Sequence, residues 1–379
     1  MTVSIALFGV VNNTAIERAA GDVLRSGQIA SGPAVEQFRR RFGAIIGTDN
    51  VATTSDMSSA MTIALRLAGA GPGTEVISMP FACLSTNAPI AGSGAVVRWA
   101  DMNPETGAID LDNVARLITR RTRALVLYHV AGYPGPAAAA AELCRDAGIR
   151  LIEDCDNALG ATIDGTSVGS FGDHAIYSFY PNRQINGIEG GAITCRSASE
   201  FERVVRLRRF GIDPARFRDG LGEIDPACDV AEIGWAATMS NLNSAVALTQ
   251  VDCVASRLAR TRHNAHRLTS ALDGLANLRP LAALPTALPA YWGFGVRVGG
   301  RDACLAAIKA AGVSASRLHH RNDGYSAFGT SEGKLPGVDA FTSTNLYLPC
   351  GWWLDDGDID RVADVVATMA MTHGTPLPA

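Results

Sequence analysis

The sequence has 379 residues, of which 47% are hydrophobic and 18% are charged, as is typical of a globular protein with more than one core. The formal net charge of −4 gives no reason to expect a nucleic acid or an anionic membrane as a partner. No apolar run reaches the roughly 20 residues of a membrane helix. The N-terminus also lacks the pattern of a secretory signal. We therefore expect a cytoplasmic protein whose eight cysteines are reduced thiols.

Short apolar runs alternate with helical patterns through the first half of the chain. One helix is predicted from residue 57 to 68, and an alanine-rich helix from 137 to 147 ends at Gly148, a suitable residue for a C-terminal cap. Near-continuous apolar strands separated by helices are typical of a mostly parallel sheet covered on both faces. Ligands of such sheets bind beyond the carboxyl ends of the strands. The predicted strands are 51–53, 75–78, 96–99, 124–128, 150–153, 175–179 and 192–195.

The pattern changes after residue 200. Long helical segments are followed by a mixed α/β region, and we predict a domain boundary between residues 245 and 255. The large domain would span residues 14–250, and a smaller domain would combine residues 1–13 with 251–379. The predicted elements of this half are helices at 199–210, 239–271, 302–311 and 358–371 and a strand at 291–298.

Two segments of the first half carry residues that suit a charged ligand. Asp154 closes a predicted strand, where a carboxylate can hold a cationic ring nitrogen, although a structural ion pair or helix cap fits its position equally well. Met57 and Ser58 lie where a helix begins, and free backbone N–H groups at that end suit a phosphate. An ordinary helix cap is the commoner explanation of such a segment.

The order of these segments is similar to the DegT/DnrJ/EryC1/StrS family of sugar aminotransferases. This resemblance implies an aspartate-aminotransferase-like fold of type I, with a mostly parallel seven-stranded sheet in the large domain and a smaller α/β domain. It also implies a pyridoxal 5'-phosphate cofactor, a sugar or nucleotide-sugar substrate, and a homodimer with its active site at the interface. The segments that carry the resemblance are 23–27, 32–38, 71–77, 129–134, 152–154, 160–161, 168–170 and 178–191.

The resemblance assigns cofactor contacts residue by residue. Asp154 would bind the pyridinium nitrogen, and Asn157 stands near the ring hydroxyl, where the family usually has glutamine. Met57 replaces the glycine of the phosphate turn, and Cys83 stands where many members stack an aromatic ring on the pyridine. The phosphate itself would contact Ser58 and Ser178.

One departure from the family decides the chemistry. Arg183 stands at the position of the lysine that forms the Schiff base with the cofactor. A guanidinium, with a pKa above about 12, does not deprotonate or form that imine. The chain has only two lysines, Lys309 and Lys334, and neither follows a predicted strand of the large domain. The other departures, at Met57 and Cys83, favour natural divergence of the site over a single engineered substitution.

Four further residues are candidates for substrate chemistry. His129 follows a strand and could serve as a base, although a satisfied structural histidine is at least as common. His319, Arg321 and Asn322 lie in a segment that resembles the branch of the family found in nucleotide-sugar pathways, and we expect them to bind substrate. Adjacent histidines without cysteine or carboxylate spacing make a poor metal motif, so no metal site is predicted.

Three functions stay open from the sequence. The first is an enzyme that binds pyridoxal or pyridoxamine phosphate non-covalently, with Arg183 as a catalytic anion clamp. The second is a cofactor-free enzyme on the same scaffold. The third is a non-catalytic partner or regulator of an active paralogue. In all three, ordinary transamination is doubtful, because Arg183 cannot hold the cofactor.

Overall fold

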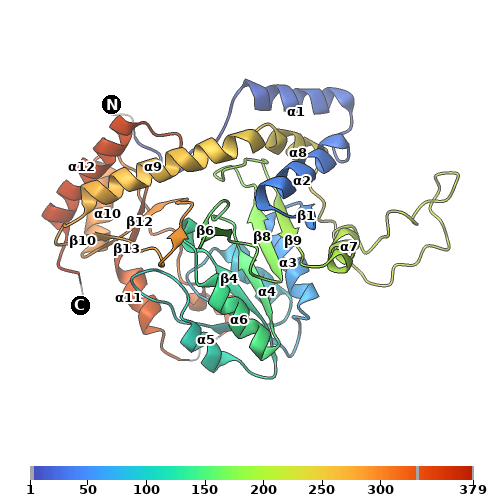
Figure 1. Cartoon of the computed structure of the whole chain (residues 1–379), viewed down its shortest axis with the longest axis horizontal. Coiled ribbons are helices and arrows are strands. Elements are labelled where there is room, and N and C mark those ends of the chain that lie inside the picture. The colour runs from blue at the N-terminus through green and yellow to red at the C-terminus, as the bar shows by residue number, and fades with distance from the viewer. Residues whose placement is uncertain (1–3, 330–332, 378–379) are drawn as a thin grey trace.

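The computed structural model describes residues 4–329 and 333–377. Its centre is a seven-stranded sheet in the order β1-β9-β8-β5-β4-β2-β3 (Figure 1). Only β9 runs antiparallel to its neighbours in this sheet. All seven predicted strands are confirmed, and most of their residues are buried, as a sheet covered by helices requires. The strands are β1 (Val51–Thr54), β2 (Glu75–Ser78), β3 (Val96–Trp99), β4 (Thr122–Tyr128), β5 (Arg150–Asp154), β8 (His174–Ser178) and β9 (Gly191–Thr194).

Helices pack against the sheet through their apolar sides. The helix α3 (Met57–Leu67) contacts β8 and β9, and α6 (Ala137–Ala147) contacts β4 and β5. The predicted helical face of α3 is confirmed, since its apolar residues, Met61 among them, are buried. The predicted C-terminal cap of α6 is confirmed by the left-handed φ of 67° at Gly148. The other helices of this half are α1 (Thr14–Ser26), α2 (Pro33–Ile46), α4 (Leu84–Gly92), α5 (Leu111–Leu117), α7 (Ala198–Leu207) and α8 (Asn241–Leu248).

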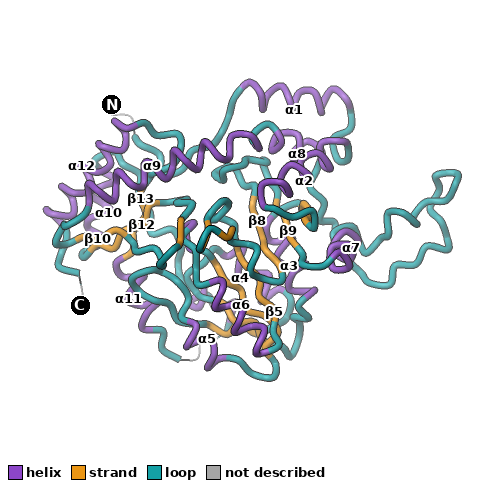
Figure 2. The backbone as a smooth tube through the Cα atoms, in the orientation of Figure 1, coloured by secondary structure: helices purple, strands orange, loops and turns teal. Residues whose placement is uncertain are grey.

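A second hydrophobic core lies beside the first. It combines Ile5 with buried residues between 265 and 370, around a three-stranded sheet in the order β10-β12-β13. The long helix α9 (Val254–Leu272) runs from the region of α8 to this second core (Figure 2). The division near residue 250 into two domains stays a prediction. The remaining elements of this half are β10 (Leu278–Pro280), β12 (Phe294–Val298), β13 (Asn345–Leu348), α10 (Arg301–Ala310), α11 (Pro336–Thr344) and α12 (Asp356–His373).

Two predicted elements differ from the structure. The helix predicted at 239–271 is divided into α8 and α9 by a 3₁₀ turn at Val251–Cys253. The strand predicted at 291–298 begins only at Phe294, because Tyr291 takes a left-handed φ of 51° and turns the chain. A small sheet of β6 (Thr162–Ile163), β7 (Thr166–Ser167) and β11 (Ala287–Leu288) joins segments from both halves of the chain.

The segment between α7 and α8 projects from the body of the molecule as a long loop, drawn yellow-green in Figure 1. The helices within residues 4–329 and 333–377 are all too short or too polar to cross a membrane.

Candidate functional site

The candidate site lies where three parallel strands end side by side. Tyr128 ends β4 and is paired in register with Asp154, the last residue of β5, while Ser178 ends β8. Because β5 and β8 are neighbours in the sheet, the loops that follow them approach each other beyond the strand ends. The sheet thus brings together the segments that the sequence predicted to carry chemistry.

Asp154 is fully buried and held on both sides. Its Oδ2 accepts a hydrogen bond of 2.7 Å from Thr86 Oγ1, and its Oδ1 accepts one of 3.1 Å from the backbone N–H of Asp156. Burial, with a further contribution from the charge of Asp156, raises the pKa of Asp154 to about 7. Asp154 is therefore an acid that exchanges a proton near neutral pH.

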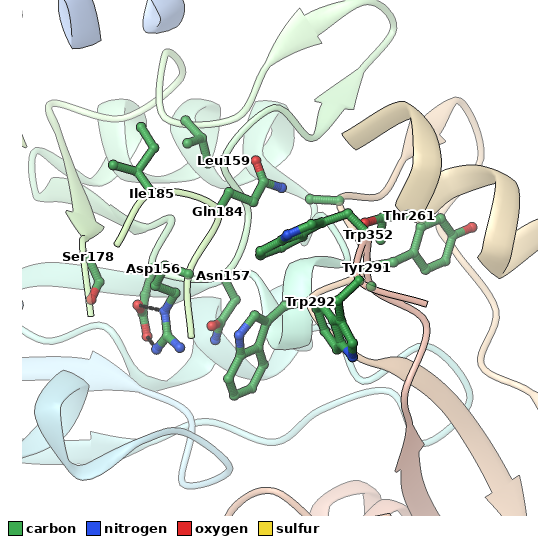
Figure 3. Close-up of a pocket in the computed structure, with 14 residues that line it drawn as sticks. Asp156, Asn157, Leu159, Ser178, Gln184, Ile185, Thr261, Tyr291, Trp292 and Trp352 are labelled. Atoms are coloured by element: carbon green, nitrogen blue, oxygen red, sulfur yellow. Dashed lines mark hydrogen bonds and ion pairs between the residues drawn. The ribbon is translucent and has the colours of Figure 1, made fainter. Parts of the chain in front are cut away.

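Arg183 is paired with Asp156, a residue that the sequence analysis did not select. Nε and Nη2 of Arg183 donate to the two carboxylate oxygens of Asp156 at 2.6 and 2.7 Å, as the dashed lines in Figure 3 show. The Arg183 side chain is only 12% exposed and that of Asp156 only 3%. Burial lowers the pKa of Arg183, but the Asp156 charge more than offsets this and the pKa is raised. The guanidinium is therefore a fixed, neutralised cation.

Further contacts fix the guanidinium of Arg183 in place. It lies over the ring of Trp292 with its Cζ 4.6 Å from the ring centroid, and its Nη1 donates to Asn182 Oδ1. Trp292 Nε1 in turn donates to the carbonyl of Asn182 at 3.0 Å. Because Asp156 occupies the forked edge of Arg183, that edge cannot clamp a ligand anion as the sequence analysis expected.

A hydrogen-bonded chain orients Asn157 next to this pair. Asn157 Nδ2 donates to the Tyr128 hydroxyl at 2.7 Å, and the N–H of Ala131 donates to the same oxygen at 3.4 Å. Both lone pairs of that oxygen are then used, so its proton is available to His319 Nε2 at 3.1 Å. Burial lowers the pKa of His319 to about 4, which keeps the imidazole neutral. Asn157 Oδ1, in a side chain 5% exposed, has no partner among the described residues.

The unpartnered oxygen belongs to a narrow cavity of about 20 Å³ with aromatic walls. Gln184 Oε1, a second buried acceptor without a partner in the described chain, belongs to the same lining. Trp292 and Trp352 supply two of the walls (Figure 3). A volume of this size holds about one water-sized group. The cavity is thus suited to a single hydrogen-bond donor.

The N-terminus of α3 lies near Ser178. Ser178 is paired with Gly191, and a Cβ on Gly191 would lie 2.6 Å from the carbonyl oxygen of Asp56, so only glycine permits this approach. The carboxylate of Asp56 caps the helix by accepting from the N–H of Ser59 at 2.8 Å. Burial raises the pKa of Glu189, and the charge of nearby Asp56 raises it further. Two carboxylates therefore stand where the resemblance places a phosphate.

These residues do not fit pyridoxal phosphate. Asp154, the expected partner of the ring nitrogen, has no exposed surface. Asp56 and Glu189 oppose a phosphate dianion near Met57 and Ser58. The side chain of Met57 is buried in the hydrophobic core and offers no polar contact. Neither the phosphate nor the ring nitrogen of the cofactor therefore has a suitable binding site here.

The catalytic role predicted for His129 is corrected by its surroundings. Its Nε2 pairs with Glu153 Oε2 at 3.2 Å, and its Nδ1 accepts from the N–H of Gly135 at 3.0 Å, with the side chain fully buried. Glu153 also accepts three backbone N–H groups, from Gly169, Phe171 and Gly172. His129 is therefore a structural histidine with both ring nitrogens in use.

Two of the three predicted substrate residues are also structural. Arg321 forms a bidentate ion pair with Asp323 and a further one with Asp339. Asn322 accepts from Asn87 Nδ2 at 2.9 Å and donates to two backbone carbonyls at 3.1 Å. Neither side chain has a free polar group directed at Asn157. Of the three, only His319 joins the site.

The structure also places the remaining sequence candidates. Cys83 precedes α4 and is partly exposed. Lys309 and Lys334 are both exposed, and neither lines the narrow cavity. Sequence reasoning missed Asp156 and Trp292. A second carboxylate two residues after Asp154 was a visible signal for the first, whereas nothing local marked the second.

Comparison with known proteins gives consistent matches over the whole chain. A model of the DegT/DnrJ/EryC1/StrS aminotransferase family matches residues 12–367. The chain is 27% identical to dTDP-3-amino-3,4,6-trideoxy-alpha-D-glucose transaminase from Streptomyces venezuelae, covering 93% of this chain and 92% of that protein. It is similar to the sugar aminotransferase CalS13 from Micromonospora echinospora, with a TM-score of 0.91, 28% identity and coverage of 96% and 99%. Spr1654 from Streptococcus pneumoniae in its PLP form shares the fold, with a TM-score of 0.88, 21% identity and coverage of 98% and 100%.

Proposed function

Because the chain belongs to the DegT/DnrJ/EryC1/StrS aminotransferase family, we propose that it acts on a sugar or nucleotide sugar in a biosynthetic pathway, without a bound pyridoxal cofactor and without transamination. The observation that carries this proposal is the buried, bidentate pair of Arg183 and Asp156 beyond the ends of β5 and β8. This pair stands where a cofactor-binding lysine is expected. A guanidinium held in this way can neither form an imine nor carry a proton away from a substrate carbon.

The polar groups of the narrow cavity support a sugar ligand. Asn157 Oδ1 and Gln184 Oε1 are acceptors without donors, so a ligand hydroxyl can satisfy them. Aromatic walls beside a few fixed polar groups are a common way to orient a small molecule. One hydroxyl of a sugar fits the cavity, whereas a second ring does not. The rest of the sugar would remain outside it.

The proton chemistry available at this site comes from carboxyl groups. Asp154 exchanges a proton near neutral pH, and the carboxylate of Asp156 is ion-paired with Arg183. Two neighbouring carboxyl groups in different environments are a known basis for acid–base chemistry. We propose that this pair takes the place of the lysine amine in holding a proton. A homodimer, as implied by the family resemblance, forms part of the proposal and can be checked by light scattering.

Cofactor binding provides the test. The protein is incubated with pyridoxal phosphate or pyridoxamine phosphate, filtered, and its absorption and mass are recorded before and after borohydride. We expect no retained chromophore and no adduct in the wild type. We expect the double variant Asp156→Ala, Arg183→Lys to stay colourless as well, because Asp56 and Glu189 still oppose the cofactor phosphate although the amine is supplied. The single variant Arg183→Lys should also stay colourless, because Asp156 would pair with the new ammonium.

The matched control is Arg145→Lys, which adds a lysine at an exposed position of α6 and should give no specific chromophore. Retention of either cofactor form by the wild type at micromolar concentration would contradict the proposal. Such a result would support non-covalent cofactor use instead. A double variant that folds and retains a reducible chromophore would show that the pocket lacks only its lysine, and this result would also contradict the proposal.

A further inference from the structure

A basic hollow of about 500 Å³ lies on the surface beside α10. Its walls come from α10, from the segment 316–321 and from α11. No acidic residue belongs to this lining, although the chain as a whole has a net charge of −4. The charged side chains that line it are Arg301, Lys309, Arg317 and Arg321, accompanied by His319 and His320.

The positive charge of the hollow is only partly compensated. Arg301 and Arg317 share one carboxylate, that of Asp302, at 2.9 and 3.5 Å. Asp302 is 68% exposed, so water weakens both pairs. Lys309 is exposed and has no ion pair within the described chain. Arg321 is the exception, since two aspartates neutralise it. The hollow therefore offers a mobile ammonium and a shared guanidinium to an anion.

The walls of the hollow are held in place by internal contacts. Nη1 of Arg301, whose side chain is 13% exposed, donates to the carbonyl of Thr342 on α11. Ser316 Oγ accepts from the N–H of Leu318 at 3.0 Å, and Leu318 itself takes a left-handed φ of 61°. A non-glycine residue in that conformation costs free energy and is often found at binding sites. The turn places Arg317 and His319 on the wall.

We infer that this hollow binds the phosphate or diphosphate group of a small molecule. Guanidinium and ammonium groups recognise phosphate oxygens by charge-assisted hydrogen bonds, and an opening of this volume is in the range of small-molecule sites. A polyanion such as a nucleic acid is a poorer fit, because the chain as a whole has a net charge of −4. The inference goes beyond the proposed function and does not depend on the absence of a pyridoxal cofactor.

The hollow and the Arg183 site share one residue. His319 lines the hollow and its Nε2 lies 3.1 Å from the Tyr128 hydroxyl, which holds Asn157. A ligand whose phosphate lies in the hollow is therefore separated by one side chain from the hydrogen-bonded chain that orients the cavity. The hollow and the narrow cavity are thus connected through His319, Tyr128 and Asn157.

Calorimetric titration of the full-length protein with inorganic pyrophosphate, uridine diphosphate and uridine tests the inference. We expect both phosphate compounds to bind at low salt and uridine not to bind. Lys309→Ala and Arg317→Ala should each weaken binding about tenfold, the scale of one charge-assisted contact, and Lys309→Arg should restore it. The control is Lys334→Ala, which removes the only other lysine of the chain and should leave binding unchanged.

Three results would overturn the inference. These are no heat of binding with pyrophosphate at about millimolar concentration, wild-type affinity in both alanine variants, or equal affinity for sulfate and pyrophosphate. The variant Asp156→Ala, Arg183→Lys should bind pyrophosphate as the wild type does. Loss of binding in that variant alone would locate the anion at the Arg183 site, which also contradicts the inference. Failure of pyrophosphate binding would therefore not affect the outcome of the cofactor-binding test of the proposed function.

Discussion

The Arg183 site and the basic hollow are both built around arginine, yet they hold their charges in opposite ways. Arg183 is 12% exposed and meets a carboxylate that is 3% exposed, whereas Arg317 in the hollow is 56% exposed and shares a solvated aspartate. A buried cation requires a dedicated partner because charges are costly to remove from water. The comparison teaches that the carboxylate supplied by the fold, rather than the arginine itself, decides whether the cation is available to a ligand.

The two sites should therefore respond differently to the loss of an arginine. Arg183→Ala leaves Asp156 buried without its partner, and we expect the free energy of unfolding to fall by about 3–5 kcal/mol. Urea denaturation at pH 7.5 provides the measurement. The double variant Arg183→Met, Asp156→Leu should recover most of the loss, because it removes both charges. A loss below about 1 kcal/mol in Arg183→Ala would mean that water reaches the pair, and the contrast with the hollow would then disappear.

The second prediction uses the pH dependence of stability. In the folded protein Asp154 has a pKa of about 7, against its ordinary value of 3.8. The stability that neutral Asp154 contributes is therefore fully present below pH 4 and lost as the pH rises through 7. We expect unfolding free energy to fall between pH 5 and pH 8 by at least about 1 kcal/mol more in the wild type than in Asp154→Asn, since one pKa unit corresponds to about 1.4 kcal/mol.

Equal slopes in the two proteins would show that Asp154 does not titrate in this range. Thr86→Val offers a further check, because the hydroxyl of Thr86 lowers the pKa of Asp154. Loss of that hydrogen bond should move the decline of stability to higher pH. The direction of the shift, rather than its size, is the informative result.

The smallest effect is expected in the hollow. Lys309→Ala and Arg317→Ala should each change the free energy of unfolding by less than about 0.5 kcal/mol, because exposed charges contribute little to stability. Thermal or urea unfolding of both variants beside the wild type gives the comparison. A large destabilisation would mean that these side chains support the fold, and their effect on anion binding could then not be read as loss of a ligand contact.

Much of the large sheet was predictable from local pattern. Strands such as β4 and β5 contain consecutive buried apolar residues, 124–128 and 151–152, and a sheet covered on both faces makes that pattern favourable. Asp154 was selected for its position at the end of a strand, whereas Ser178, which ends β8, was assigned through the family resemblance. Residues at strand ends can be located in a sequence because strands are short and of similar length.

The partners of the site residues were not predictable in this way. Asn322 is held by Asn87 across 235 residues, and Trp292 is bonded to Asn182 across 110. His129 and Arg321 were candidates for chemistry because of their residue type and position, and a satisfied structural histidine stayed open for His129. Burial and long-range contacts decided that both are satisfied within the protein. The type of a residue determines which hydrogen bonds and ion pairs it can form, but not whether other residues of the protein already occupy them.

The sequence by itself determined that the chain carries an arginine at position 183 and no lysine in that region, and hence that no imine can form there, because this follows from the chemistry of the guanidinium. Only the tertiary structure decided that Arg183 would be closed off from a ligand anion. Asp156 follows β5 and Arg183 follows β8, and their meeting depends on the parallel pairing of these two strands. The charges of Lys309 and Arg317 in the basic hollow remain available because, within the described residues, no buried carboxylate pairs with either of them.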